Sequence, residues 1–288
     1  VAGEIIASNL GGASSMLGDF PNMLIATEMH IPFYAFVQYM MPISIINLAI
    51  VFLYFYAKVD FEDEPGDIKT ITLPQVRIRN PRELMWQCAI LVLMIFLFSF
   101  RHIHGGLVAL CGSLSIFALS SHREAALRKL KVQEDIRFFF LLFILVGGVK
   151  ASGLLQTMMD TLRFLSGGSG FVQCILLMWG AAFGTMFLNA GPTTALFLPI
   201  FLGVDGGLPD KLIFWSLSLG VCAGSSGTLM GATAGPLALT FMEKFEGMTK
   251  GVMRQRVFKD YLEFGLPIAY LHLLVSTIYI TFLFLMGR

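Results

Sequence analysis

The stretch that decides the fold is Asn-Leu-Gly-Gly-Ala-Ser-Ser-Met-Leu-Gly-Asp-Phe-Pro-Asn, residues 9–22. It combines three glycines, a proline and a carboxylate, and apolar sequence follows it. In an aqueous protein such a string is an ordinary turn-rich loop. Inside a bilayer, an irregular backbone with a charge is tolerated only where it is buried in protein or lines a site. The rest of the chain therefore decides how residues 9–22 are interpreted.

The composition is that of a membrane protein. Of 288 residues, 56% are hydrophobic and 14% are charged, whereas soluble domains carry about 25% charged residues. At roughly 20 residues per span, the chain has room for about eight or nine membrane segments. The four cysteines are isolated in apolar runs, which indicates buried thiols rather than a disulfide or metal pattern. We expect an all-α polytopic protein, integral and multi-pass, in a bacterial inner membrane.

Apolar segments alternate with breaks and polar loops along the chain. Residues 1–8 are expected to end a helix, 9–18 to be a break and 19–29 a short half-helix. Pro42 is expected to kink a span over residues 33–58. The later expected elements are spans at 84–101, 105–120, 136–155 and 260–287, an amphipathic connector at 156–168, and two half-helices at 211–223 and 232–243 around a break at 224–231.

Residues 170–203 predict a re-entrant hairpin. A continuous helix of this length would measure about 50 Å, which exceeds the hydrocarbon thickness of about 30 Å. A tip at Asn189–Thr193 divides it into two arms. Charge placement supports the same interpretation, because the loops rich in Lys and Arg (58–82, 121–131 and 244–259) all fall on the cytoplasmic side only if 170–203 re-enters.

The opening stretch has a second copy. Gly11–Asp19 aligns with Gly224–Ala232, and Phe33–Ile43 aligns with Phe258–Ile268. With the topology above, the copies run in opposite directions across the membrane. Inverted repeats with broken helices are typical of secondary transporters, and the breaks mark the binding site. We expect residues 1–58 to end the first repeat, whose upstream part would precede Val1, 59–82 to be a cytoplasmic linker, and 83–288 to form the second inverted repeat.

Four stretches resemble the ion transporter superfamily. Residues 9–22 are similar to its Asn-Ile-Gly-Gly…Gly-Asp-Pro-Pro-Asn motif, and residues 135–148 resemble its Phe-rich span ending in Val-Gly-Gly. Residues 189–194 resemble its Asn-x-x-Pro hairpin tip, and residues 224–235 its Gly-Thr-Leu-Ile-Gly-Ala break. The closer resemblance is to the ArsB/NhaD branch, which includes arsenite permeases, Na+–H+ antiporters, the P protein and citrate-transporter-like permeases. Phe20, Ser226 and Gly235 depart from the family pattern.

The breaks supply the oxygen ligands that a small hard cation such as Na+ prefers. Asp19 is the sharpest candidate, because a membrane-embedded carboxylate can bind a cation or exchange a proton. The structural alternative is that Asp19 caps the helix that follows it. Asp19 and Asn189 are the expected Na+ ligands. The candidate ion- or substrate-binding residues are Asn9, Ser14, Ser15, Asp19, Asn22, Asn189, Thr193, Thr194, Ser225, Ser226 and Thr228.

The resulting functional hypothesis is a secondary active ion transporter, with Na+/H+ antiport-like cation–proton exchange favoured. The alternative is a permease for arsenite or a di- or tricarboxylate, coupled to Na+ or H+; half-helix N-termini suit such an anion. A channel of this fold also stays open. An intramembrane aspartyl hydrolase is remote because it needs two membrane carboxylates, and no second Asp lies mid-span. We expect no enzyme activity, no cofactor and no nucleic-acid partner, with a small ion as substrate and the bilayer as surroundings; a homodimer is left open.

Overall fold

The computed structural model describes residues 2–58, 80–100, 103, 105–121, 123–124, 127, 132–204, 208–209, 211–235 and 250–287. Every regular element in these ranges is an α-helix. The helices are α1 (Ala2–Ala13), α2 (Phe20–Glu28), α3 (Phe33–Lys58), α4 (Pro81–Leu97), α5 (Gly105–Leu119), α7 (Val132–Ala151), α8 (Leu154–Leu165), α9 (Gly170–Leu188), α10 (Ala190–Leu202), α11 (Leu212–Gly227) and α13 (Lys250–Leu285).

Four of the described helices are long and apolar enough to cross a bilayer: α3, α4, α9 and α13. A fifth span arises if α7 and α8, which are bent by 62° relative to each other, count as one. The described part thus holds fewer full spans than the eight or nine that length allows, because α5, α10 and α11 are each shorter than a full crossing. The all-helical polytopic fold class is confirmed.

Helix α11 lies at the centre of the fold, and all of its residues are buried. It runs parallel to α9, since contacts along the two helices keep the same register. Near the start, Cys174 Sγ and Ser216 Oγ are 2.9 Å apart, and at the end the Thr228 hydroxyl donates to the Met186 carbonyl at 2.7 Å. Between them, Gly224 permits a close approach, because a Cβ there would overlap the backbone of α9. The C-terminal ends of α9 and α11 therefore lie side by side.

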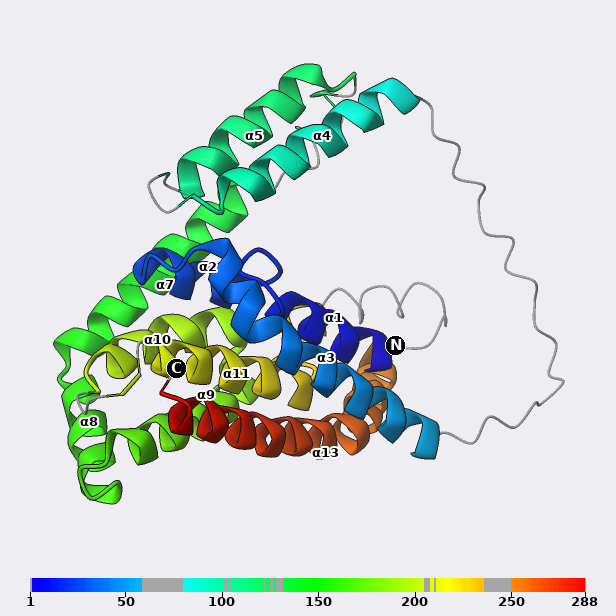
Figure 1. Ribbon diagram of the computed structural model, residues 1–288. Coiled ribbons are helices and arrows are strands. Elements are labelled where there is room, and N and C mark those ends of the chain that lie inside the picture. Colours follow the sequence, from blue (N-terminus) through cyan, green and yellow to red (C-terminus); the bar gives the residue numbers. More distant parts are fainter. Residues whose placement is uncertain are drawn as a thin grey trace, which may run out of the picture.

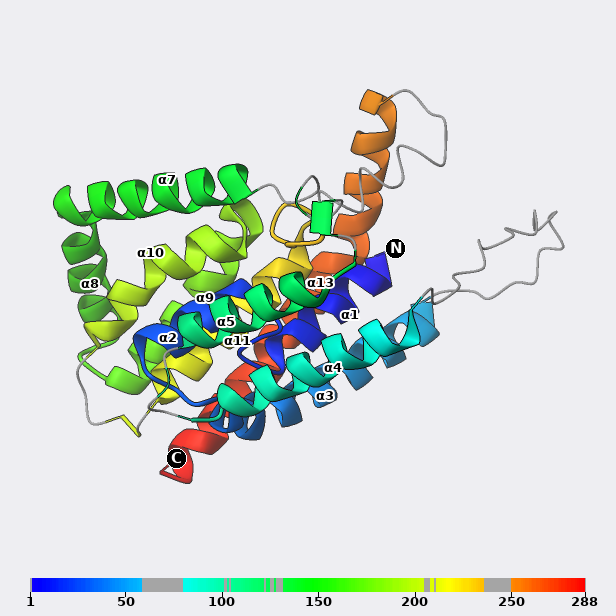
Figure 2. The same cartoon turned by 90° about the horizontal axis from the view of Figure 1, so that it is seen from above.

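Helices α3 and α13 run antiparallel to each other (Figures 1 and 2). The Tyr279 hydroxyl, late in α13, donates to the carbonyl of Tyr39, early in α3, at 2.6 Å. At the other end, the rings of Phe55 and Phe264 stack with centroids 5.5 Å apart. The two spans that follow the two breaks are thus paired in opposite directions.

Several helix and break boundaries in the structure differ from those predicted from the sequence. Helix α1 continues to Ala13, so the first break covers residues 14–19 rather than 9–18. Helix α10 begins at Ala190, so the hairpin turns at Asn189 alone. The connector at 156–168 is largely the helix α8, and α11 extends to Gly227 before the second break begins. Residues 59–79 of the linker predicted at 59–82 and most of the second half-helix at 232–243 lie outside the described residues.

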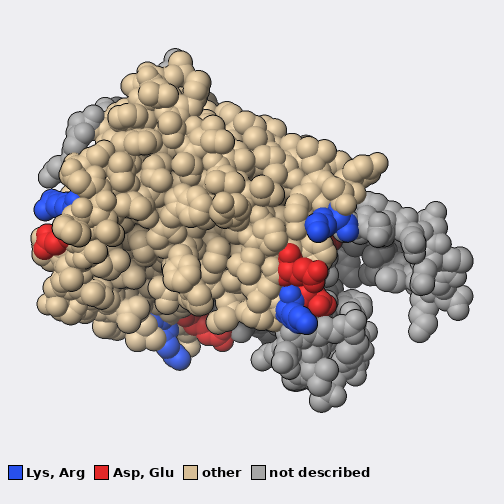
Figure 3. All heavy atoms as spheres, turned by 90° about the horizontal axis from the view of Figure 1, so that it is seen from below, with Lys and Arg blue, Asp and Glu red and all other residues tan. Residues whose placement is uncertain are grey.

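The surface agrees with a membrane environment. Figure 3 shows Lys, Arg, Asp and Glu side chains in patches at the margins of one face, with a broad uncharged surface between them. Large apolar side chains such as Phe52, Leu145 and Ile278 are more than half exposed. In water such a surface would be costly, whereas in a bilayer it faces lipid.

Candidate ion-binding site

The side chain of Asn22 holds the backbone of the first break in place. Asn22 lies in the first turn of α2 and is buried. Its side-chain amide donates to the carbonyls of Ala13 at 3.2 Å and Ser15 at 3.1 Å, with a longer contact to Gly12 at 3.5 Å. Its carbonyl oxygen accepts from the Ser218 hydroxyl of α11 at 2.6 Å. Asn22 therefore satisfies the carbonyls that the end of α1 leaves open, and its hydrogen-bonding groups are engaged in this structural task.

Asp19 is the N-cap of α2. One carboxylate oxygen, Oδ1, accepts the backbone N–H of Phe20 at 2.9 Å, so the structural alternative considered for Asp19 is correct. The second oxygen accepts no hydrogen bond from the described residues, which leaves it available to a ligand. The carboxylate also interacts electrostatically with the buried Cys222 thiol of α11. Asp19 thus combines a capping role with a free ligand atom close to the central helix.

Asn9 links the two halves of the chain. Its side-chain amide donates to the Ser225 carbonyl at 3.0 Å, and its own backbone carbonyl lies 3.7 Å from Cys222 Sγ. Asn9 and Cys222 occupy the same place in the two aligned copies, so α1 and α11 meet at equivalent positions. Ser14 is engaged locally, since its hydroxyl donates to the Gly11 carbonyl at 2.6 Å.

The hairpin tip is a single residue, Asn189, with φ 71° and ψ 160°. Residues other than glycine rarely adopt this combination of angles. The Asn189 backbone carbonyl accepts both the N–H of Thr193 at 3.3 Å and the Thr193 hydroxyl at 2.8 Å. The Thr194 hydroxyl donates to the Ala190 carbonyl. Both threonines are fully buried with their hydroxyls bonded inside α10, so they stabilise the tip rather than point free oxygens from it.

The second break is also internally bonded. The Ser225 and Ser226 hydroxyls both donate to the Cys222 carbonyl, at 2.8 and 3.2 Å. The Tyr261 hydroxyl of α13 donates to the Ser226 carbonyl at 3.3 Å. Thr228 accepts the N–H of Gly231 at 2.9 Å while it donates to α9. These contacts fix the backbone at the end of α11 and in the second break in one conformation.

The three irregular elements converge. The Asn189 amide donates to the Met230 carbonyl of the second break at 3.4 Å. A Cβ on Gly191, in the first turn of α10, would lie 3.1 Å from the ring of Phe20 at the start of α2. The N-termini of α2 and α10 and the C-termini of α1 and α11 therefore gather around one region, where helix dipoles and freed backbone groups can act on an ion.

Sequence reasoning missed the residues that hold this region together. Ser218, Cys222 and Tyr261 each bond to one of the predicted residues, yet they lie inside regular helices and carry no local motif. Their only signal in the sequence is their position relative to the breaks. Of the predicted residues, Asn9, Ser15, Asp19 and Asn189 each retain a side-chain oxygen without a hydrogen bond to the described residues.

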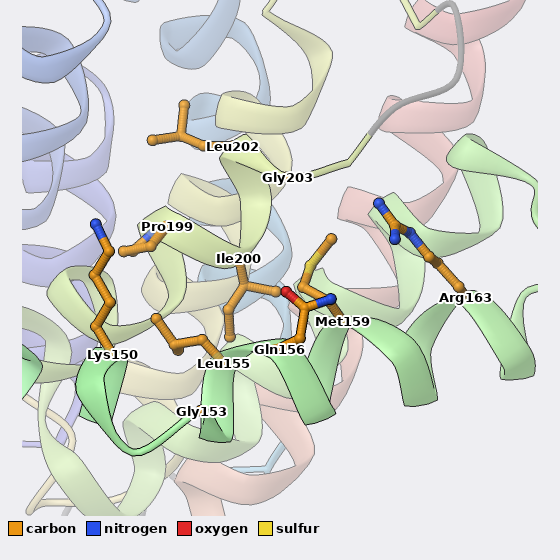
Figure 4. Close-up of a pocket in the computed structure, with 10 residues that line it drawn as sticks. All are labelled: Lys150, Gly153, Leu155, Gln156, Met159, Arg163, Pro199, Ile200, Leu202 and Gly203. Atoms are coloured by element: carbon orange, nitrogen blue, oxygen red, sulfur yellow. The ribbon is translucent and has the colours of Figure 1, made fainter. Parts of the chain in front are cut away.

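Two surface cavities lie apart from the predicted residues. One of about 410 Å³ is lined by residues at the end of α2 and just after it, by the turn between α4 and α5 and by Met16 of the first break. The other, of about 600 Å³, lies between α7, α8 and α10. Figure 4 shows Lys150 at one end of it and Arg163 at the other, with Gln156 between them. The second cavity offers positive charge at both ends.

Comparison with known proteins agrees with this architecture. The sequence is 32% identical to the magnetosome protein MamN of Magnetospirillum gryphiswaldense, over 98% of this chain and 68% of that protein. An uncharacterized transporter of Mycobacterium tuberculosis is 28% identical over 82% of this chain and 57% of its own length. The P protein of Mus musculus is 23% identical over 66% of this chain and 25% of its own length.

A family profile gives the assignment. The profile of the citrate transporter family (CitMHS), within the ion transporter superfamily, matches residues 1–220. This family and the relatives named as transporters confirm that the chain is a membrane transporter rather than an enzyme. The chain is an integral multi-pass membrane protein with bacterial relatives. It belongs to the citrate transporter (CitMHS) family.

Proposed function

We propose that the chain is the core of a secondary active ion transporter in which Asp19 binds the transported cation and the exchanged proton in turn. The observation that carries the proposal is the second oxygen of the Asp19 carboxylate, which accepts no hydrogen bond from the described residues at the break between α1 and α2. A carboxylate at such a position is costly in a membrane unless it pairs with an ion or a proton. Competition between the two for one group yields exchange.

The neighbouring oxygens favour a small hard cation. Ser15 and Asn189 supply side-chain oxygens, and the ends of α1 and α11 supply backbone carbonyls close by. Oxygen donors of this kind suit Na+. We therefore favour Na+/H+ antiport of the kind that the resemblance to the ArsB/NhaD branch implies, with Asp19 and Asn189 as the proposed Na+ ligands.

The second candidate is a cation-coupled permease for an anion such as citrate. The family profile carries that substrate in its name. The N-termini of α2 and α10 lie beside each other, and helix N-termini favour anionic groups. The cavity flanked by Lys150 and Arg163 could gather a polycarboxylate before it reaches the breaks. In a cation-coupled permease, Asp19 would bind the cation whose gradient drives anion uptake, rather than a cation exchanged for protons.

The arrangement of the halves is part of the proposal. We propose that residues 1–58 and 83–288 belong to two inverted repeats joined by the linker at 59–82. The antiparallel pairing of α3 with α13 supports this division. Alternating access would then expose the shared region around Asp19 and Asn189 to each side in turn.

The test uses the full-length protein in proteoliposomes that contain a pH-sensitive dye. Inward gradients of Na+, Li+, K+, citrate and arsenite are imposed one at a time. We expect an inward Na+ or Li+ gradient to make the lumen more alkaline, because each entering cation expels protons. Citrate uptake that needs a cation gradient would instead favour the permease. No pH change and no uptake with any of these ions would overturn the transport proposal.

A further inference from the structure

Three buried polar residues lie on α3 and α13, the two apolar spans that pack antiparallel. His272 and Ser276 lie one turn apart on α13, and Asn47 lies on α3; their side chains are 3%, 1% and 2% exposed. Four of their side-chain atoms have no hydrogen-bond partner among the described residues: Asn47 Oδ1, both ring nitrogens of His272 and Ser276 Oγ. None of these residues belongs to the region around Asp19.

The positions of Asn47 and His272 along α3 and α13 are equivalent. Each lies five residues after the proline inside its helix, Pro42 or Pro267. Asn47 is eight residues from both Tyr39 and Phe55, the two positions where α3 contacts α13. His272 is likewise about midway between the matching contacts on α13. The antiparallel register therefore places Asn47 and His272 at the same level, midway between the two contacts.

Leaving these atoms unpaired would be expensive. A buried polar group without a partner costs about 1 to 3 kcal/mol, and such groups in native proteins are usually satisfied by ordered water. The three residues supply both donors and acceptors: a hydroxyl, an amide and an imidazole with two nitrogens. Water bound here would be bridged by groups from both helices.

We propose that Asn47, His272 and Ser276 form an internal water site at the centre of the membrane region, in which His272 takes up and releases the proton coupled to transport. The proton part of this inference rests on the proposed ion–proton coupling. The step moves one proton between bound water and an imidazole nitrogen and makes or breaks no other bond. An imidazole changes charge within the physiological pH range, which suits it to this task.

In the proposed site, a positive charge on the His272 ring would be stabilised by the bound water. Within the described residues, burial alone acts on the ring, and no charged group interacts with it. Counting only residues whose side chains the structure describes, the titratable groups on α13 and on the helices packed against it are Glu4 on α1, Tyr34, Tyr39, Tyr54, Tyr56 and Lys58 on α3, Cys174 on α9, Cys222 on α11, and Lys259, Asp260, Tyr261, Glu263, Tyr270 and Tyr279 on α13 itself. A transient imidazolium would therefore depend on hydration.

The water site is tested on the unmodified full-length protein by mass spectrometry. The C2 hydrogen of histidine exchanges with deuterium only where water reaches the ring. We expect His272 to exchange measurably although its ring is buried, with the exposed His30 as the internal reference. Asn47→Leu, which removes one water ligand, should slow the exchange at His272 and leave that at His30 unchanged. Absence of exchange at His272 in the parent protein would overturn the water site.

The proton role is tested by transport in proteoliposomes across about pH 5 to 8, the range in which a hydrated imidazole titrates. His272→Gln should lose the pH dependence of transport that the parent shows, while His30→Gln should keep it. A His272→Gln variant that binds the ion and retains the parent's pH profile would overturn the proton role. If the parent shows no ion-driven pH change, the proposed function and the proton role fail together, and deuterium exchange at His272 still decides the water site.

Discussion

The side-chain amide of Asn9, near the end of α1, donates a hydrogen bond of 3.0 Å to the backbone carbonyl of Ser225, near the end of α11. The two residues are 216 positions apart in the chain, and each precedes a break in its helix. The bond satisfies a carbonyl of the last turn of α11, which has no partner within its own helix. It thereby ties the two broken helices together at the level where the ion is proposed to bind.

Removal of this bond should weaken the fold. Asn9→Ala leaves the Ser225 carbonyl buried without a partner, which should lower the free energy of unfolding by about 1 to 3 kcal/mol. Thermal unfolding in detergent measures the effect. Asn80→Ala is the matched control, because the exposed Asn80 side chain makes no cap hydrogen bond to α4 and, among the described residues, bonds to nearby Glu83. Equal stability of the two variants would show that the bond does not join the halves.

Substitutions of Asp19 can separate the effect of its helix-capping oxygen on stability from the effect of its negative charge. Asn is as good an N-cap as Asp, so Asp19→Asn should unfold within a few tenths of a kcal/mol of the parent. Asp19→Ala removes the acceptor for the Phe20 N–H and should cost about 1 kcal/mol. The comparison is made by thermal unfolding of both variants. A large loss of stability in Asp19→Asn would mean that the charge itself holds the break.

The close packing of α9 and α11 depends on glycine. A Cβ at Gly224 would overlap the Ala182 carbonyl, so Gly224→Ala should push the helices apart and cost about 1 to 3 kcal/mol. Gly147→Ala on α7 meets no atom within 4 Å and serves as the control. We expect only Gly224→Ala to lower the melting temperature. A neutral Gly224→Ala would contradict the parallel packing described above.

The topology can be checked with cysteine labelling in a background where Cys88 and Cys111, both exposed, are replaced by serine. Ser152→Cys lies in the exposed turn between α7 and α8, and Lys259→Cys lies near the start of α13. An impermeant thiol reagent should label the first in intact cells and the second only after permeabilisation, because basic segments stay in the cytoplasm. Labelling of Lys259→Cys from outside would contradict the re-entrant hairpin.

The sequence predicted the long spans well and the broken helices less well. Hydropathy alone located α3, α4 and α9, since an apolar run of that length has few alternatives. The first break was placed too early because glycines at 11 and 12 suggest irregular backbone. Those residues stay helical, since the side chain of Asn22 supplies hydrogen bonds that the end of α1 lacks. That contact comes from the next helix, beyond the reach of a local pattern.

The candidate site was predicted in its location rather than in its detail. The motifs identified the three irregular elements, and these do converge. They could not distinguish residues with free oxygens from residues whose oxygens are already bonded, such as Thr193 and Thr194. That distinction depends on rotamers and on partners far along the chain. For the same reason the shared level of Asn47 and His272 emerged only from the register of two packed helices.

The central claim is that the Asp19 carboxylate binds the transported ion, and ion-driven pH change in proteoliposomes of the full-length protein tests it most directly. The parent, Asp19→Asn and Glu28→Gln are compared under the same Na+ gradient; Glu28 is an exposed carboxylate at the opposite end of α2. We expect the parent and Glu28→Gln to make the lumen alkaline and Asp19→Asn, folded to the same extent, to produce no change. An Asp19→Asn protein that matches the parent for every ion tested would contradict the account.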